Sequence, residues 1–183
     1  MAIIKEEELI VQLQDPNTRR KAFSEVIHAY QERLYWQIRK MVMVHEDADD
    51  VLQNTFLKAW KSLDSFRGES KLSTWLFRIA INESITFLNK QKQEREITVE
   101  DGDSYLVDNL EADAYFDGDE LQLLLQKAIL TLPEKQRMVF NMRYFDEMKY
   151  EKISDILGTS VGALKASYHI AAKKIEEYFT LRE

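Results

Sequence analysis

The chain has 183 residues, of which 45% are hydrophobic and 31% are charged, a composition that indicates a globular fold and excludes a disordered or membrane-embedded chain. Its formal net charge of −7 at pH 7 would repel polyanions, and the absence of cysteine excludes disulfides and thiol chemistry. With only two prolines and five glycines to interrupt helices, the sequence predicts an all-α fold.

The N-terminal segment MAIIKEEELIVQLQD lacks the basic region and the small-residue cleavage site of a secretion signal. No stretch approaches the roughly 18 consecutive apolar residues that a membrane-spanning helix needs. Since the lack of cysteine also fits a reducing compartment, we expect a cytoplasmic protein without membrane insertion.

Residues 21–92 show apolar spacing near 3.6, which predicts three helices separated by short connections. Gly68 and Ser70 interrupt this spacing, so we expect a loop at 66–72, with Ser73 as the N-cap of the following helix. The predicted apolar faces contain Phe23, Val26, Ile27, Tyr30, Leu34, Ile38 and Met41, then Val51, Leu52, Phe56, Ala59, Trp60 and Leu63, then Trp75, Leu76, Ile79, Ala80, Ile85 and Leu88.

Aromatic and basic side chains gather around the 66–72 loop, in the segment FRGESKLSTWLFRIAINE. Stacking of an unpaired base on an aromatic or guanidinium plane contributes about 1–3 kcal/mol, and lysines can contact phosphates. The simpler alternative is that Trp75 and Phe77 belong to the core and that the charges decorate a loop. The residues of this strip are Phe66, Arg67, Lys71, Trp75, Phe77, Arg78 and Asn82.

The acidity of the chain is concentrated in one segment. Residues 94–119 contain ten acidic residues and one arginine, a net of −9, so −7 − (−9) leaves +2 for the rest of the chain. The segment has no sustained apolar period, which favours a linker. We therefore predict two small helical domains, 1–92 and 121–183, joined by an acidic linker at 93–120.

Residues 149–176 show the pattern of a helix-turn-helix. Gly158 can end the first helix in a left-handed conformation, and Ser160 can cap the second. An apolar stripe on the second helix is opposed by a face with small residues and lysines, which suits a helix that enters a major groove. An ordinary helical hairpin with a solvated basic face is the alternative. The stripe contains Leu164, Tyr168, Ala171, Ile175 and Phe179.

Together these segments resemble the extracytoplasmic-function (ECF) sigma factors of the sigma-70 family. The resemblance rests on DADDVLQNTFLKAWKSLDSFRGESKLSTWLFRIAIN followed by LPEKQRMVFNMRYFDEMKYEKISDILGTSVGALKASYHIAAKKI, over about residues 20–92 and 121–178. It implies a promoter-specificity subunit of bacterial RNA polymerase, with a region 2-like domain, a region 4-like domain and no enzymatic activity of its own.

The resemblance also implies roles for particular residues and partners. The helix DDVLQNTFLKAW would dock on the clamp helices of the largest polymerase subunit, through Asp50, Gln53, Asn54 and Trp60. The segment FRGESKLSTWLFRIAIN would open the −10 element and hold an unpaired base, through Arg67, Ser70, Lys71, Trp75, Arg78 and Asn82. The C-terminal domain would meet the flap region and read the −35 element through Lys165, Ser167, His169, Lys173 and Lys174.

The recognition helix departs from the usual family pattern, because many relatives carry arginines where this chain has Ser167, Ile170 and Ala172. The resemblance further implies an anti-sigma factor as a partner and no cofactor. Since the −9 segment would repel DNA, we expect weak promoter binding by the isolated chain, which a gel-shift assay without core polymerase would check.

Two other classes of function, a stand-alone regulator and an enzyme, fit the sequence less well. A self-sufficient helix-turn-helix regulator would need two recognition helices, usually from a dimer, and leaves residues 47–83 without a role. An enzyme has little support, because the three histidines lie far apart in sequence and no phosphate-binding glycine motif is present. The acidic residues of HEDADD at 45–50 are better explained by the dipole of a helix N-terminus than by a metal site.

Overall fold

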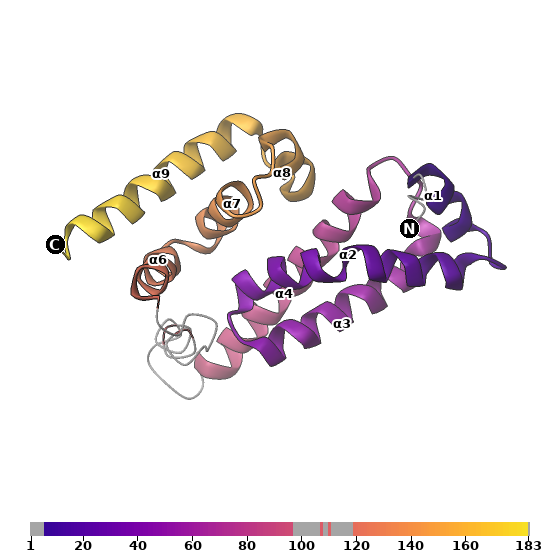
Figure 1. The fold of residues 1–183 in the computed structure, drawn as a ribbon, viewed down its shortest axis with the longest axis horizontal. Coiled ribbons are helices and arrows are strands. Elements are labelled where there is room, and N and C mark those ends of the chain that lie inside the picture. Colours follow the sequence, from indigo (N-terminus) through magenta and orange to yellow (C-terminus); the bar gives the residue numbers. More distant parts are fainter. Residues whose placement is uncertain (1–5, 97–106, 108–109, 111–118, 183) are drawn as a thin grey trace. The chain divides into compact units, whose positions relative to one another are not determined.

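The structure is a computed structural model that describes residues 6–96, 107, 110 and 119–182 (Figure 1). Every regular element within these residues is a helix, which confirms the predicted all-α class. The chain divides into two compact units, residues 1–39 with 45–87 and residues 40–44 with 88–183. Each unit is described by itself below. Over the described residues, no helix has the length and hydropathy needed to cross a bilayer.

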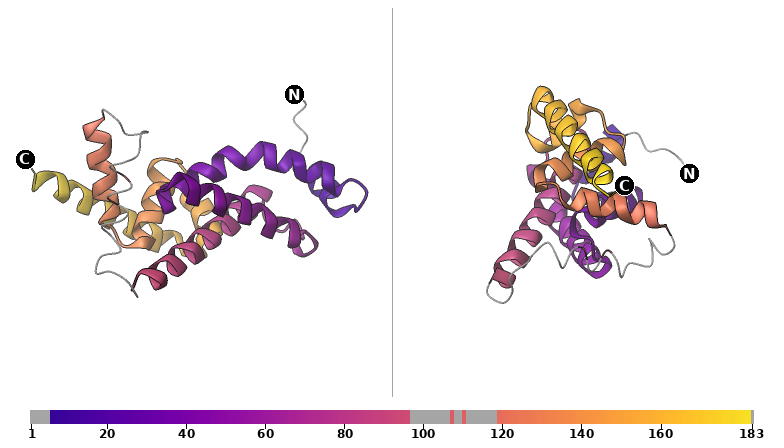
Figure 2. Two further views of the ribbon diagram at one scale, coloured as in Figure 1. Left: turned by 90° about the horizontal axis from the view of Figure 1, so that it is seen from below. Right: turned by 90° about the vertical axis from the view of Figure 1, so that its left-hand side faces the viewer.

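The first unit is built around three long helices that lie side by side, with a short helix at one end (Figures 1 and 2). Two buried hydroxyls in this bundle bond to their own helix, since Thr55 Oγ1 donates to the Val51 carbonyl at 2.7 Å and Ser84 Oγ to the Ala80 carbonyl at 2.8 Å. The elements are α1 (Glu6–Gln14), α2 (Arg19–Val42), α3 (His45–Lys61), the 3₁₀ turn η1 (Leu63–Ser65) and α4 (Leu72–Glu96).

The buried face of α4 is turned slightly from the predicted one. Phe77 and Ile81 are both 2% exposed and point into the bundle, whereas Trp75 and Ile79 are half-buried. Phe77 therefore belongs to the core, as the simpler alternative for this segment predicted. The guanidinium carbon of Arg33 lies 5.6 Å from the centre of the Phe77 ring.

The N-terminus of α4 also differs from the prediction. The helix starts at Leu72, so Ser73 lies within its first turn and is buried, and the prediction of Ser73 as N-cap was wrong. The Leu72 amide instead donates to Glu6 Oε1 of α1 at 2.6 Å. A carboxylate from another helix thus satisfies one of the amides that a helix start leaves open, and its charge suits the helix dipole.

The second unit contains α6 (Glu120–Leu130), α7 (Glu134–Tyr144), α8 (Tyr150–Leu157) and α9 (Val161–Thr180). The long helix α9 packs against each of the other three. Asp119 caps α6, because its Oδ1 accepts from the Gln122 amide at 3.0 Å. The core cluster of this unit contains Ala128, Ile129, Leu132, Phe140, Ala171 and Ile175.

Most of the expected acidic linker lies outside the described residues. At its start, α4 continues to Glu96, and Leu110 is buried in a cluster with Leu130. The division of the chain into 1–92, 93–120 and 121–183 therefore stays a prediction.

Candidate functional site

The 66–72 loop sits against an aromatic pair. Phe66 is 5% exposed, and its ring lies 4.7 Å from that of Trp75, centre to centre, at an angle of 33°. Trp75 is half-buried, so one part of its indole packs on Phe66 and the rest meets solvent. A rigid aromatic plane that is held on one side and open on the other can accept a stacked base.

Charged and polar side chains flank Trp75 in the loop and on α4. Arg67 and Lys71 are exposed in the loop, and Arg78 and Asn82 are exposed on α4. Trp75, Arg78 and Asn82 follow at i, i+3 and i+7, so they share one face of that helix. Ser70 is half-buried at the loop end. The six predicted positions thus lie in one short segment with the chemistry of a single-strand binding surface.

One side of α3 forms a second surface. Asp50, Gln53 and Asn54 are all exposed, and the buried stripe of the helix consists of Ala48, Val51, Thr55 and Ala59. None of the three belongs to the apolar face predicted for this helix, and their exposure agrees with that prediction. Leu57 continues their strip at i+7 from Asp50 and is 55% exposed.

Sequence reasoning missed Leu57, and it placed Trp60 both on the predicted apolar face and among the clamp contacts. Leu57 could have been found from its position on the polar side of the helix, because an apolar residue there has no core to enter. Trp60 is 39% exposed, yet its ring centre lies 5.1 Å from that of Phe23. Trp60 therefore both packs on α2 and offers part of its ring to a partner.

The helix-turn-helix of α8 and α9 forms as predicted. Gly158 ends α8 with φ 66° and ψ 25°, and Ser160 caps α9 by accepting from the Ala163 amide at 3.3 Å. Leu164, Ala171 and Ile175 of the predicted stripe are buried, and its two aromatic members are half-buried. The local sequence alone was sufficient to predict both helix ends, because Gly158 and Ser160 are themselves the capping residues of the turn.

The solvent face of α9 carries the predicted cations. Lys165, His169 and Lys173 follow at i, i+4 and i+8 and are exposed on one side of the helix. Lys174 lies toward the other edge, where its Nζ donates to Gln136 Oε1 at 3.2 Å, and Ser167 is half-buried. Between these edges, the exposed residues in the first half of the helix are small or apolar, namely Gly162, Ala163, Ala166 and Ile170, and nearer the helix end Lys173 Nζ lies 4.0 Å from Glu177 Oε1.

The acidic start of α3 is engaged in local contacts. Tyr35 Oη and His45 Nδ1 lie 2.7 Å apart, and His45 Nε2 lies 3.4 Å from Asp49 Oδ2. Over the described part of the chain, no group of three or more acidic or histidine residues could hold a metal ion.

Comparisons with known proteins agree for both units. A family model of sigma-70 region 2 matches residues 26–94, and one of sigma-70 region 4 matches residues 122–175. The ECF RNA polymerase sigma factor SigW of Bacillus subtilis is 31% identical over 156 residues, which are 81% of this chain and 83% of that protein. The chain belongs to the ECF group of the sigma-70 family. The resemblance stated from sequence is thereby confirmed.

Other sigma factors match over similar lengths. The RNA polymerase sigma-H factor of Pseudomonas aeruginosa is 30% identical over 166 residues, 86% of each chain. Among solved structures, CnrH in complex with the cytosolic domain of CnrY shares the fold with a TM-score of 0.69 and 22% identity, over 97% of this chain and 99% of that one. As an ECF sigma factor, the protein directs core RNA polymerase to specific promoters and promotes DNA opening.

The region 4-like part of this sigma factor contains an aromatic cluster that the sequence did not predict. The Tyr150 ring lies 6.4 Å from Tyr168, and both Arg143 and Lys165 lie over it, at 5.2 and 5.9 Å from its centre. Cations over a tyrosine face are held by the ring quadrupole. The first residue of α8 thus contacts Lys165, the lysine closest to the start of α9.

Proposed function

We propose that this sigma factor works through three surfaces: the α3 strip (Asp50, Gln53, Asn54, Leu57 and Trp60), the −10 surface (Arg67, Ser70, Lys71, Trp75, Arg78 and Asn82) and the exposed face of α9. The observation that carries the proposal is the half-open indole of Trp75 beside exposed arginines and a lysine. Trp75 lies within the segment that matches sigma-70 region 2, and most of α9 lies within the match to region 4.

The −10 surface provides the energy to hold one base outside the duplex. Extraction of a base costs a few kcal/mol, and stacking on an aromatic plane returns about 1–3 kcal/mol. Contacts of Arg67 and Lys71 with phosphates supply the remainder. Trp75 then receives the base, while Arg78 and Asn82 follow the strand along the same face of α4.

The α3 strip is proposed to bind the clamp helices of the largest polymerase subunit. Its polar residues Asp50, Gln53 and Asn54 precede the exposed Leu57 by seven, four and three residues, so polar and apolar side chains share one face of the helix, as in protein interfaces. The partly exposed Trp60 adds an aromatic anchor of the kind that dominates interface energetics.

The exposed face of α9 is proposed to read the −35 element. Lys165 and Lys173 contact phosphates, and the small residues between the lysines let the helix approach the groove. His169 and Ser167 are the candidates for contacts with base edges.

Replacing both Lys165 and Lys173 with alanine should weaken promoter binding by the holoenzyme, most strongly at low salt. Each lost phosphate contact removes about 0.9 from the slope of log affinity against log salt, so the slope should fall by about 1.8. Filter binding or fluorescence anisotropy over a salt series measures this slope. Lys21→Ala with Lys135→Ala, two exposed lysines on α2 and α7, controls for the loss of two positive charges, and an unchanged slope in the Lys165 and Lys173 variant would place the phosphate contacts elsewhere.

We further propose that the protein acts in the cytoplasm, without catalytic activity or a cofactor of its own. An anti-sigma factor is a fitting partner, since RpoE of Bartonella quintana, which shares the fold with a TM-score of 0.68 and 24% identity over 89% of this chain and 99% of that one, was solved in complex with the anti-sigma factor NepR.

Run-off transcription with purified core polymerase tests the function. Start sites should appear that depend on this chain, and the chain should co-purify with the core enzyme. The alternative, a stand-alone helix-turn-helix regulator, predicts tight promoter binding without core polymerase and the same start sites with and without the chain. That outcome would overturn the proposal.

A further inference from the structure

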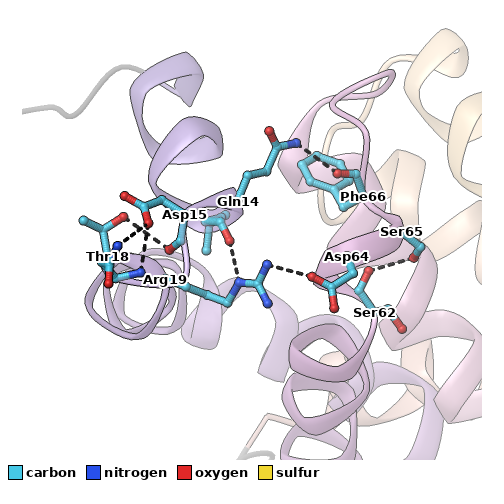
Figure 3. Close-up of polar contacts among 10 residues, drawn as sticks. Gln14, Asp15, Thr18, Arg19, Ser62, Asp64, Ser65 and Phe66 are labelled. Carbon is cyan, nitrogen blue, oxygen red and sulfur yellow. Dashed lines mark hydrogen bonds and ion pairs between the residues drawn. The ribbon is translucent and has the colours of Figure 1, made fainter.

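One face of the N-terminal helix α1 lies against the whole 66–72 loop. Glu6, Ile10 and Gln14 follow at i, i+4 and i+8, so they share that face. Glu6 Oε1 accepts from the Leu72 amide at 2.6 Å. Gln14 Nε2 donates to the Phe66 carbonyl at 3.3 Å (Figure 3). The three side chains therefore reach the end, the middle and the start of the loop.

The middle contact depends on Gly68, which has φ +72°, a conformation that side chains with a Cβ rarely adopt. A Cβ added there would lie 3.7 Å from Ile10 Cγ2, so the loop backbone comes close to α1 at this point. The loop thus bends back onto the helix at its one left-handed residue among the described positions 66–72.

The far end of α1 is tied to the same region. Arg19 Nε donates to the Leu13 carbonyl at 2.8 Å, and its Nη2 lies 2.7 Å from Asp64 Oδ1 in η1 (Figure 3). Leu13 itself is 1% exposed. The Arg19 guanidinium thus links the last turn of α1 to η1, the turn that precedes Phe66.

The charge of Glu6 also reaches α2. Burial raises the pKa of Tyr30, and the Glu6 carboxylate raises it further, while Arg33 lowers it. Glu6 thus lies where α1, α2 and the start of α4 meet, and its carboxylate is only partly exposed. Such a position suits a side chain that holds a backbone amide rather than one that decorates the surface.

We propose that α1 is a brace for the −10 surface, in which Glu6, Ile10 and Gln14 are positioning residues that hold the 66–72 loop and, through Phe66, the Trp75 ring. This role rests on the proposed capture of a base by Trp75. Since Phe66 lies 4.7 Å from Trp75, a loop that leaves α1 also changes the support of the indole. None of the three α1 residues touches DNA in this account.

Glu6→Ala removes the acceptor for the Leu72 amide, whereas Glu6→Gln keeps an acceptor oxygen without the charge. Glu7→Ala is the matched control, because Glu7 is the next residue of the same helix and is exposed on another face. Gln14→Ala, at an exposed position, tests the other end of the loop with little risk to folding.

Hydrogen exchange of the free protein is the first measurement. Loss of a charge-assisted hydrogen bond corresponds to about a tenfold shift in a local opening equilibrium, so exchange at Leu72 should become about tenfold faster in Glu6→Ala. Glu6→Gln should restore most of the protection, and Glu7→Ala should match the unaltered protein. Equal exchange in Glu6→Ala and Glu7→Ala would overturn the brace.

Promoter discrimination is the second measurement. In holoenzyme, Glu6→Ala and Gln14→Ala should lower the ratio of initiation between the cognate promoter and one with an altered −10 base, while core affinity stays unchanged. A general loss of folded protein would lower initiation at both promoters equally. Normal discrimination in these variants alongside impaired opening in Trp75→Ala would overturn the brace alone. Normal opening in Trp75→Ala would overturn the base capture on which the brace depends.

Discussion

Promoter opening should fall by about fivefold to 150-fold when Trp75 is replaced by alanine, which is the rate equivalent of the roughly 1–3 kcal/mol that base stacking contributes. Core polymerase binding should be affected much less, because the α3 strip is unchanged. The reason is the half-open indole, which is held by Phe66 on one side and meets solvent on the other. Permanganate reactivity of downstream thymines measures the opening directly.

Trp75→Phe is the matched control for this prediction. A phenyl ring keeps an aromatic plane against Phe66 and so retains part of the stacking surface. The thermal midpoints of both variants separate a local effect from a loss of folded protein. Normal thymine reactivity in Trp75→Ala would contradict the role of the indole.

Core association should weaken by about 2–4 kcal/mol, roughly thirtyfold to several hundredfold in Kd, when Asp50 and Gln53 are both replaced by alanine. Both side chains are exposed on the free surface of α3, so their removal leaves the buried stripe intact. Partner groups that they would have bonded are then left unpaired in the interface. Titration of labelled sigma factor with core polymerase measures the change.

Gln31→Ala with Glu32→Ala provides the matched control, since it removes the same amide and acidic side chains from exposed positions of α2. Leu57→Ala should also weaken association, because a side chain that is 55% exposed in the free protein gains burial only in a complex. If the Asp50 and Gln53 variant binds core polymerase normally, the clamp contact lies on another surface.

Local signals explain why the C-terminal half was predicted well. Gly158 and Ser160 both act within their own turn, so the helix ends could be located from a few neighbouring residues. The exposure of Asp50, Gln53 and Asn54 likewise followed from helical spacing. The roles of these residues in polymerase and DNA binding remain predictions.

The prediction failed where two distant segments meet. Ser73 has the composition of an N-cap, yet the start of α4 is bonded by Glu6, 66 residues earlier in the chain. For Phe77 and Trp75 the sequence left open whether each ring is core or base contact, and packing decided it, since the Phe77 ring is buried in the bundle with the Arg33 guanidinium carbon 5.6 Å from its centre. Both outcomes depend on which neighbour is close in space, and helical periodicity carries no information about that neighbour.

The sequence by itself determined that this protein is helical, that it ends in a helix-turn-helix and that it belongs among the ECF sigma factors, because spacing, caps and motif order are properties of adjacent residues. Tertiary structure alone decided which aromatic ring remains partly exposed, that Leu57 and Trp60 reach the surface, and that α1 bonds to both ends of the 66–72 loop. Burial and long-range hydrogen bonds arise only when helices pack, and packing selects one of several faces that the periodicity allows.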